Sequence, residues 1–166
     1  MVSTISAVDL NFTGNITVAG NTVISGNMSA AGTIYANYAD LAEYFDVKKD
    51  VVLKPGDPTS IAGLRTLTTY NGKNYAGIIS TEPGVMLGRS RTQAIALALA
   101  GTVPVRTSDT SIKIGDTLVL TKKGKIIRKR FWSLFLTVVG IAQEKYKKTS
   151  FGPNGSSETL LNCLLD

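Results

Sequence analysis

The sequence contains no histidine and only one cysteine among its 166 residues. Without histidine the chain cannot form a Ser/His/Asp triad, a Cys/His pair or the usual catalytic zinc site. The single cysteine, Cys163, cannot close a disulfide within the chain, so stability must come from packing or from assembly with other chains. Phosphate-binding glycine loops and metal-ligand spacings are also missing, and we therefore predict no metal and no cofactor.

Long apolar runs are absent as well. The longest, FWSLFLTVVGIA at residues 131–142, holds twelve residues, whereas a membrane-spanning helix needs roughly 18 or more. This run predicts a buried strand or a subunit interface, and we expect no membrane insertion. The first residues, MVSTISAVDLNFTG, have neither a basic start nor a continuous apolar stretch, which predicts that no signal peptide is present.

Basic residues are missing from one part of the chain and concentrated in another. The net charge is +6, yet residues 1–47 contain no Lys or Arg, and nine of the 18 basic residues lie between Lys122 and Lys148. A nucleic-acid site is one interpretation of such a bias. However, no aromatic residues alternate with the charges in LTKKGKIIRKR. We favour a hairpin with solvated lysines around Gly124 and predict no nucleic-acid partner.

The most regular feature present is a glycine at every sixth position. Aligned in sixes, residues 8–37 read VDLNFT, GNITVA, GNTVIS, GNMSAA and GTIYAN, so that glycine leads four of the five blocks. The third and fifth positions are mostly apolar, an alternation typical of short strands with one buried face. Gly-Asn pairs favour the tight turns that would join such strands. We call residues 8–37 the hexad segment.

A fixed period of this kind indicates a stacked or fibrous architecture. At three hexads per coil, the five blocks make fewer than two coils of a single-chain β-helix, too few to cover the apolar stripe. We therefore expect several chains, most simply three, to wind together and bury their stripes against one another. The alternative is a plain run of hairpins in a globular domain.

The repeat ends at YANYADLAEYFDVKKD, where the period changes. In ADLAEYF, the side chains of Leu41, Tyr44 and Phe45 would fall on one helical face, and Asp40 and Glu43 have the spacing of a helix capping box. One interpretation is therefore a short turn of helix that begins at Asp40. The other is a pair of carboxyl groups, one acting as an acid and the other as a base.

The remainder, residues 46–166, predicts mostly short strands around one compact core. Asn71-Gly72 between alternating runs predicts a hairpin, QAIALALAGTVPVRT predicts a strand, and IKIGDTLVLTKKGKIIRK predicts another hairpin. Three aromatic residues could contact a sugar, although we expect them to pack in the core instead: Tyr70, Tyr75 and Trp132. The predicted fold class is mainly all-β. A short intertwined trimeric β-helical shaft at residues 1–37 would precede a compact β-rich trimerisation domain with one short helix at residues 38–166.

The segments YADLAEYF, GIISTEPGVMLG and ALAGTVPV…IKIGDTLVL together resemble a domain at the C-terminal ends of phage appendage and tail-fibre proteins. It is the self-cleaving intramolecular chaperone domain of neck-appendage proteins, classed among glutamic-type peptidases, and the resemblance runs from about Tyr38 to Ile141. It implies a domain that follows a β-helical stalk, helps three chains assemble in register and can cut itself from the stalk.

The same resemblance places the scissile bond after Ala39, with Asp40 and Glu43 as the acid/base pair. Glu43 would position or deprotonate a water for attack on the Ala39 carbonyl, and Asp40 would help to protonate the departing amine. In the family a small hydroxyl residue precedes the aspartate, whereas this chain has Ala39.

We predict a homotrimeric virion structural protein, made in the host cytoplasm, that forms part of a phage tail fibre, spike or appendage. Its C-terminal domain would drive trimer assembly, and other virion tail proteins would be its partners. The first alternative is a one-turnover autoprotease that cuts before Asp40; no further enzymatic activity is expected. The second is a receptor-binding module for a host surface glycan, using the basic hairpin 121–130 or the loop around Asn71.

Overall fold

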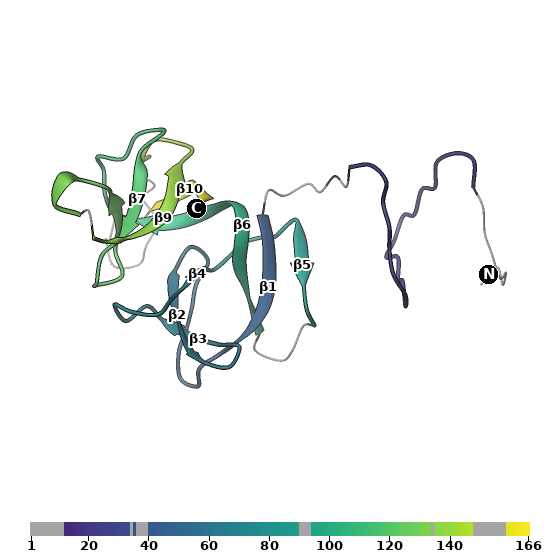
Figure 1. Ribbon diagram of the computed structural model, residues 1–166, viewed down its shortest axis with the longest axis horizontal. Coiled ribbons are helices and arrows are strands. Elements are labelled where there is room, and N and C mark those ends of the chain that lie inside the picture. Colours follow the sequence, from purple (N-terminus) through teal and green to yellow (C-terminus); the bar gives the residue numbers. More distant parts are fainter. Residues whose placement is uncertain (1–11, 34, 36–39, 90–93, 134, 148–158) are drawn as a thin grey trace. The chain divides into compact units, whose positions relative to one another are not determined.

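The computed structural model describes residues 12–33, 35, 40–89, 94–133, 135–147 and 159–166. The chain divides into two units, residues 1–35 and residues 36–166, and each is described by itself (Figure 1). We call the second unit the body. Within the described residues, no helix has the length and apolar character needed to cross a membrane.

The first unit repeats its backbone geometry with the period of its sequence. Bends fall at residues 13–14, 19–20, 25–26 and 31–32, six residues apart, but residues 12–33 contain no strand. A single chain therefore forms none of the strands expected in a shaft of several chains, and the shaft stays a prediction. Strands require hydrogen-bonding partners for their N–H and C=O groups, and this stretch of one chain has no neighbouring strand to supply them.

The body is all-β, as predicted, and its described residues contain no helix apart from one 3-10 turn. The elements in chain order are β1 (Asp40–Val47), β2 (Pro58–Gly63), β3 (Thr66–Thr69), β4 (Tyr75–Ile78), β5 (Val85–Leu87), β6 (Ala94–Thr107), β7 (Thr117–Leu120), β8 (Ile126–Arg128), the turn η1 (Phe131–Ser133), β9 (Thr137–Ala142) and β10 (Thr159–Leu165).

The short helix predicted at Asp40 is wrong, because this segment is strand β1. The sequence DLAEYFDV does not alternate with period two, but its aromatic residues and valine suit a pleated strand. Strand β1 pairs with β6 on one side and with β3 and β5 on the other. Pairing on both sides satisfies more backbone groups than one helical turn would, so the tertiary context overrides the local helix signal.

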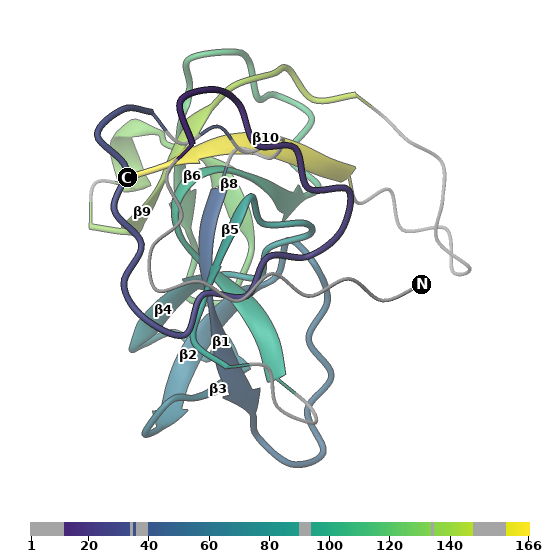
Figure 2. The same ribbon diagram turned by 90° about the vertical axis from the view of Figure 1, so that its right-hand side faces the viewer.

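The 14-residue strand β6 connects the two halves of the body. Its first half pairs antiparallel with β1, and its second half pairs with β10 and, in parallel, with β8. Because β10 also pairs with β9, β9 with β7 and β7 with β8, five strands close into a barrel-like ring. Figure 2 shows β10, in yellow, beside β6.

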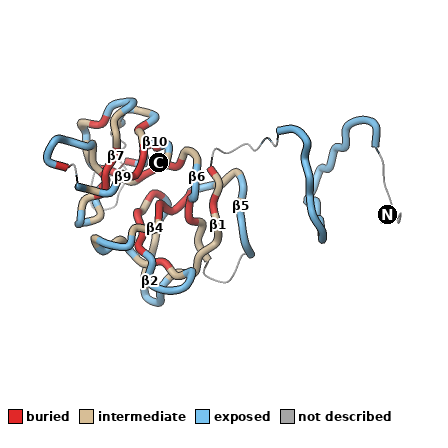
Figure 3. The backbone as a smooth tube through the Cα atoms, in the orientation of Figure 1, coloured by how far each residue is buried: buried red, intermediate tan, exposed pale blue. Residues whose placement is uncertain are grey.

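The core lies inside these sheets (Figure 3). The larger cluster fills the ring and includes Val103, Val105, Leu118, Leu120, Ile126 and Leu161. A smaller cluster of Leu67, Ile79 and Leu97 lies between β3 and β6. Tyr70 and Tyr75 pack against the larger cluster with their rings edge to face, 6.1 Å apart, as predicted, and burial raises the pKa of Tyr75. Cys163 is a buried free thiol, and burial raises its pKa to about 12.

The loops agree with the sequence predictions in part. The β7–β8 hairpin is confirmed, and its turn contains Gly124 at φ 78°. The hairpin predicted at Asn71-Gly72 is wrong, because β3 and β4 do not pair with each other; both pair with β2. Residues 131–142 form strand β9 only in their second half. In their first half, the side chains of Phe131, Trp132 and Phe135 are 89%, 67% and 100% exposed, so the packing predicted for Trp132 is wrong.

Candidate functional site

Strand β1 brings together the two motifs on which the family resemblance depends. Leu41 and Glu43 of the first motif lie in register with Val85 and Leu87 of the second, in the parallel pair β1–β5. The backbone N–H of Gly84 donates to the carbonyl of Asp40 at 2.9 Å. Segments about 40 positions apart in the sequence therefore form one continuous site.

Asp40 is buried at the start of β1, with 7% of its surface exposed. The hydroxyl of Ser80 donates to its Oδ2 at 2.6 Å. Ser80 is itself 4% exposed, and its backbone N–H donates to the carbonyl of Ala96 at 2.9 Å. A short bond from a neutral donor to a carboxylate is one of the stronger hydrogen bonds in proteins, so Ser80 fixes the position of the Asp40 side chain. Ser80 was not predicted from the sequence as a site residue, although it is the polar residue that ends the apolar run GII.

Glu43 is held by Arg65, which lies in the two-residue turn between β2 and β3. The arginine Nη1 lies 2.7 Å from Oε1 of Glu43, and Nη2 donates to the carbonyl of Tyr44 at 2.8 Å. The guanidinium also lies over the ring of Phe45, 5.2 Å from its centroid. One planar cation thus contacts three consecutive residues of β1, a combination that the rigid fork of arginine permits. Nothing in the sequence indicated this role for Arg65.

The structure does not bring Asp40 and Glu43 together within one chain. Side chains of a strand alternate between its faces, so residues three apart point to opposite sides, with their Cα atoms about 10 Å apart. The irregularity in the β1–β6 pairing does not alter this, because the extra residue, Leu99, is on β6. The predicted acid/base pair is therefore not formed by a single copy of the body. Ala39 lies outside the described residues.

A cavity of about 320 Å³ opens beside Glu43. Its lining consists of the β1 residues, the arginine that binds them and the residues that follow β5: Glu43, Tyr44, Asp46, Arg65, Gly88, Arg89 and Ala94. Two arginines and two carboxylates thus line one opening beside β1. An extended peptide that entered this cavity would meet the Glu43 carboxylate.

A second cavity, of about 400 Å³, joins the β2–β3 region to the β7–β8 hairpin. We call it the basic pocket. It is lined by Asp57, Pro58, Thr69, Tyr70, Arg106, Thr107, Ser108, Lys123, Gly124, Lys125 and Ile126. Arg106 is bound to Asp57 at 3.0 Å, which leaves the two lysines of the hairpin as the other cations of the lining. A Cβ atom on Gly72 would lie 3.1 Å from the carbonyl of Lys122, so the loop at Asn71 and the basic hairpin pack closely against each other.

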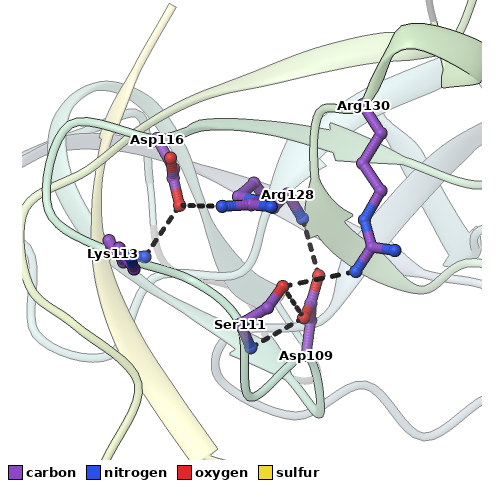
Figure 4. A network of polar contacts seen from close by, with 6 residues as sticks. All are labelled: Asp109, Ser111, Lys113, Asp116, Arg128 and Arg130. Carbon is purple, nitrogen blue, oxygen red and sulfur yellow. Dashed lines mark hydrogen bonds and ion pairs between the residues drawn. The ribbon is translucent and has the colours of Figure 1, made fainter.

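A polar network orders the loop between β6 and β7 (Figure 4). The carboxylate of Asp109 accepts bonds from the backbone N–H and hydroxyl of Ser111, at 2.9 and 2.6 Å, and from the backbone N–H of Arg128 at 3.0 Å. Although partial burial opposes it, these bonds and the charge of Arg130 hold the pKa of Asp109 below its ordinary value. Asp116 links the same loop to Arg128 and to the backbone of Lys113. We interpret this network as structural.

The part of the chain that the structure describes contains no group of three His, Cys, Asp or Glu side chains that could hold a metal ion. The candidate site holds two carboxyl groups: a buried aspartate fixed by a hydroxyl, and a glutamate fixed by an arginine beside a cavity. Both lie on β1, the first described strand of the all-β body. They are the two residues to which the resemblance stated from the sequence assigns self-cleavage.

Comparison with known proteins supports this resemblance. The sequence model of the family described as "Peptidase_G2, IMC autoproteolytic cleavage domain" matches residues 5–95, more than half of the chain. The chain belongs to this family, and the resemblance stated from the sequence is confirmed. The match starts before Tyr38 and ends at Ile95, whereas the resemblance was expected to run from Tyr38 to Ile141. It includes the hexad segment and the site residues Asp40, Glu43, Arg65 and Ser80. No curated protein sequence matches significantly.

Two solved structures have a similar fold. The pre-mature bacteriophage phi29 gene product 12 matches with a TM-score of 0.61 and 15% identity, over 86% of this chain and 24% of that chain. The C-terminal fragment of the phi29 gene product 12 matches with a TM-score of 0.54 and 16% identity, over 76% of this chain and all of that chain. This chain therefore spans about a quarter of the first structure and corresponds in extent to the second.

Proposed function

We propose that this chain is a structural component of a bacteriophage virion, part of a homotrimeric tail fibre or appendage whose body assembles three chains and then cuts itself from the preceding segment. The family membership and the likeness of its fold to that of gene product 12 of phage phi29 support this role. Other virion tail proteins would be its partners, and synthesis would take place in the host cytoplasm. Residues 1–37 would form the shaft and residues 38–166 the trimerisation domain.

The observation that carries the trimer is the exposure of the hexad segment. Its large apolar side chains are 50% to 88% exposed: Phe12, Ile16, Val18, Val23, Ile24 and Met28. Large apolar side chains exposed in every block from residue 8 to residue 31 mark an interaction surface. Three copies that wind together would bury the stripe of each against the other two, and their paired backbones would supply the hydrogen bonds that one chain cannot.

The glycines of the segment support the same conclusion. A Cβ atom added to Gly14, Gly20, Gly26 or Gly32 would meet no atom within 4 Å, and none of them has a positive φ. Bends do fall at these glycines, but within one chain neither their φ angles nor the surrounding atoms require glycine there. The close approach of a neighbouring backbone is the remaining reason for glycine at every sixth position.

The proposed self-cleavage would break the bond between Ala39 and Asp40. A water oxygen attacks the Ala39 carbonyl carbon, and the Glu43 carboxylate takes a proton from that water. The Asp40 carboxyl group then helps to pass a proton to its own departing amine as the C–N bond breaks. Ser80 and Arg65 would hold the two carboxyl groups in place. The family is one of autoproteolytic domains, which supports this reaction for the present chain.

Two measurements test the proposal. Light scattering on the full chain is expected to give three times the mass of one chain. Intact-mass measurement on fresh protein is expected to reveal a fragment that begins at Asp40 in the wild type and not in a Glu43→Gln variant. A folded monomer whose hexad amides are already protected from hydrogen exchange would contradict the trimeric shaft, and an uncut wild type would contradict self-cleavage alone.

The basic pocket favours a second candidate function, the binding of an anionic host glycan. The pocket brings together the two loops that the sequence analysis suggested for this role, and it places Tyr70 beside Lys123 and Lys125. We would test a Lys123→Ala/Lys125→Ala variant on an array of charged and neutral glycans. Its matched control is Lys113→Ala/Lys145→Ala, which removes the same charge from exposed positions elsewhere. Equal binding by both variants would contradict a specific site.

A further inference from the structure

The position of Arg65 determines the direction in which Glu43 points. The arginine belongs to the turn that pairs with the end of β1, since its carbonyl accepts a bond from the N–H of Asp46 at 2.9 Å. From there its guanidinium reaches back over Phe45 to the Glu43 carboxylate. The carboxylate is therefore directed toward the Asp46 end of β1, away from Asp40, where the bond to be cut lies.

Asp40 lies on the opposite face of the same strand, bound to Ser80. Its Cα atom is about 10 Å from that of Glu43, and a strand paired on both sides cannot bend to close this distance. A general base must come within hydrogen-bonding distance, directly or through one water, of the group it activates. One copy of the body does not place Glu43 at its own junction.

We propose that Glu43 of one copy acts on the bond between Ala39 and Asp40 of a neighbouring copy, an inference that rests on the proposed trimer and its self-cleavage. The cavity beside Glu43 is about 320 Å³, within the range of about 300–1,000 Å³ typical of ligand sites. Its lining holds two arginines and two carboxylates, and Arg65 is bound to Glu43, so the charges of the lining are balanced. Apart from Asp40, which is bound to Ser80, residues 33–40 (TIYANYAD) carry no charge. An uncharged extended segment suits a lining of balanced charge, and we therefore take the junction of a second copy as the occupant.

The chemistry is a hydrolysis divided between two copies. The neighbour's Glu43 takes one proton from water, whose oxygen bonds to the Ala39 carbonyl carbon. The C–N bond then breaks, and the Asp40 carboxyl group of the chain being cut assists in protonating its own departing amine. In a threefold assembly, Glu43 of each copy would meet the junction of the next copy around the axis, so that three identical sites form together. This arrangement explains why the bond would stay intact until assembly.

Complementation between two inactive full-length chains tests the inference. One chain carries Glu43→Gln and keeps a junction that can be cut; the other carries Asp40→Asn and keeps Glu43. Each alone is expected to remain intact. Co-expressed with different tags, they are expected to form mixed assemblies in which only the Glu43→Gln chain is cut. Co-expressed wild-type chains with the same two tags serve as the control for mixing.

A dilution experiment provides an independent measurement. Wild-type chains are co-expressed with a tenfold excess of chains carrying both Asp40→Asn and Glu43→Gln. Cleavage by a neighbour predicts that the fraction of wild-type chains cut falls by about tenfold, because most neighbours lack Glu43. An unchanged fraction, or an intact Glu43→Gln chain in verified mixed assemblies, would overturn cleavage between copies. A wild-type chain that is never cut would instead refute the proposed self-cleavage on which the inference rests.

Discussion

Replacing Ser80 with alanine removes the hydroxyl that donates to the buried Asp40 carboxylate. The two side chains belong to residues that are only 4% and 7% exposed, and the bond is 2.6 Å long. Because water has little access, the carboxylate cannot exchange this donor for solvent. A hydrogen bond to a charged group contributes about 1.5–3 kcal/mol. We therefore expect the free energy of unfolding to fall by about 1.5–3 kcal/mol in Ser80→Ala.

The assay is urea denaturation in a double-mutant cycle of Ser80→Ala and Asp40→Ala. All four proteins carry Glu43→Gln, so that self-cleavage does not change the chain during the measurement. Chain concentration is held constant, because assembly makes the apparent stability depend on it. The cycle isolates the interaction between the two side chains from their other contacts.

We expect a coupling energy above about 1 kcal/mol between the two substitutions. The matched control is Ser108→Ala, at an exposed position, which is expected to change the free energy of unfolding by less than about 0.5 kcal/mol. If the effects of Ser80→Ala and Asp40→Ala on the free energy of unfolding were additive within about 0.5 kcal/mol, the hydroxyl would not hold the carboxylate. The assignment of Ser80 to the site would then be wrong.

Three further predictions concern the glutamate site, the polar network and the shaft. Arg65→Ala is expected to slow cleavage by at least about tenfold, measured by intact mass over time. Arg65→Lys is expected to retain part of the cleavage rate, because lysine keeps the charge but not the planar fork. Equal cleavage rates in the two variants would contradict a positioning role for Arg65. Asp109→Asn is expected to lower the free energy of unfolding by about 1–3 kcal/mol at pH 7. Because the pKa of Asp109 is lowered by folding, that difference should shrink as the pH falls below about 3.9, and a difference independent of pH would refute it. Ile16→Ser with Met28→Ser is expected to lower the protection of the hexad amides from hydrogen exchange without changing the circular dichroism of the body, and unchanged protection would argue against burial of the stripe.

The β class of the body was predictable because its apolar residues alternate and its turns carry glycine. The strand β6 and the β7–β8 hairpin followed directly from these local patterns. The pairing partners did not, because they depend on contacts between distant segments. The turn Asn71-Gly72 is a strong local hairpin signal, yet β3 and β4 both pair with β2. The helix predicted at Asp40 failed for the same reason, since pairing with β6 overrides a capping pattern.

Of the residues of the candidate site, only the two carboxylates, Asp40 and Glu43, could be predicted from the sequence. Asp40 and Glu43 belong to a recognisable motif, but the distance between their side chains depends on whether the motif forms a helix or a strand. Three residues apart, they are neighbours on a helix and lie on opposite faces of a strand. Arg65 and Ser80 could not be predicted, because each reaches the site through a pairing that only the fold reveals.

Strand β10 has a consequence for the order of events in the cell. It is the last in chain order of the ten strands that the structure describes, and it pairs with β6 on one side and β9 on the other. Until it has been synthesised, the ring that it completes remains open and the apolar interior of the ring is unprotected. Under the proposed function, the hexad segment, which precedes all ten strands, would wait without partners while they are translated. Translation itself would thus act as the timer that delays winding of the fibre until a finished body exists to align it.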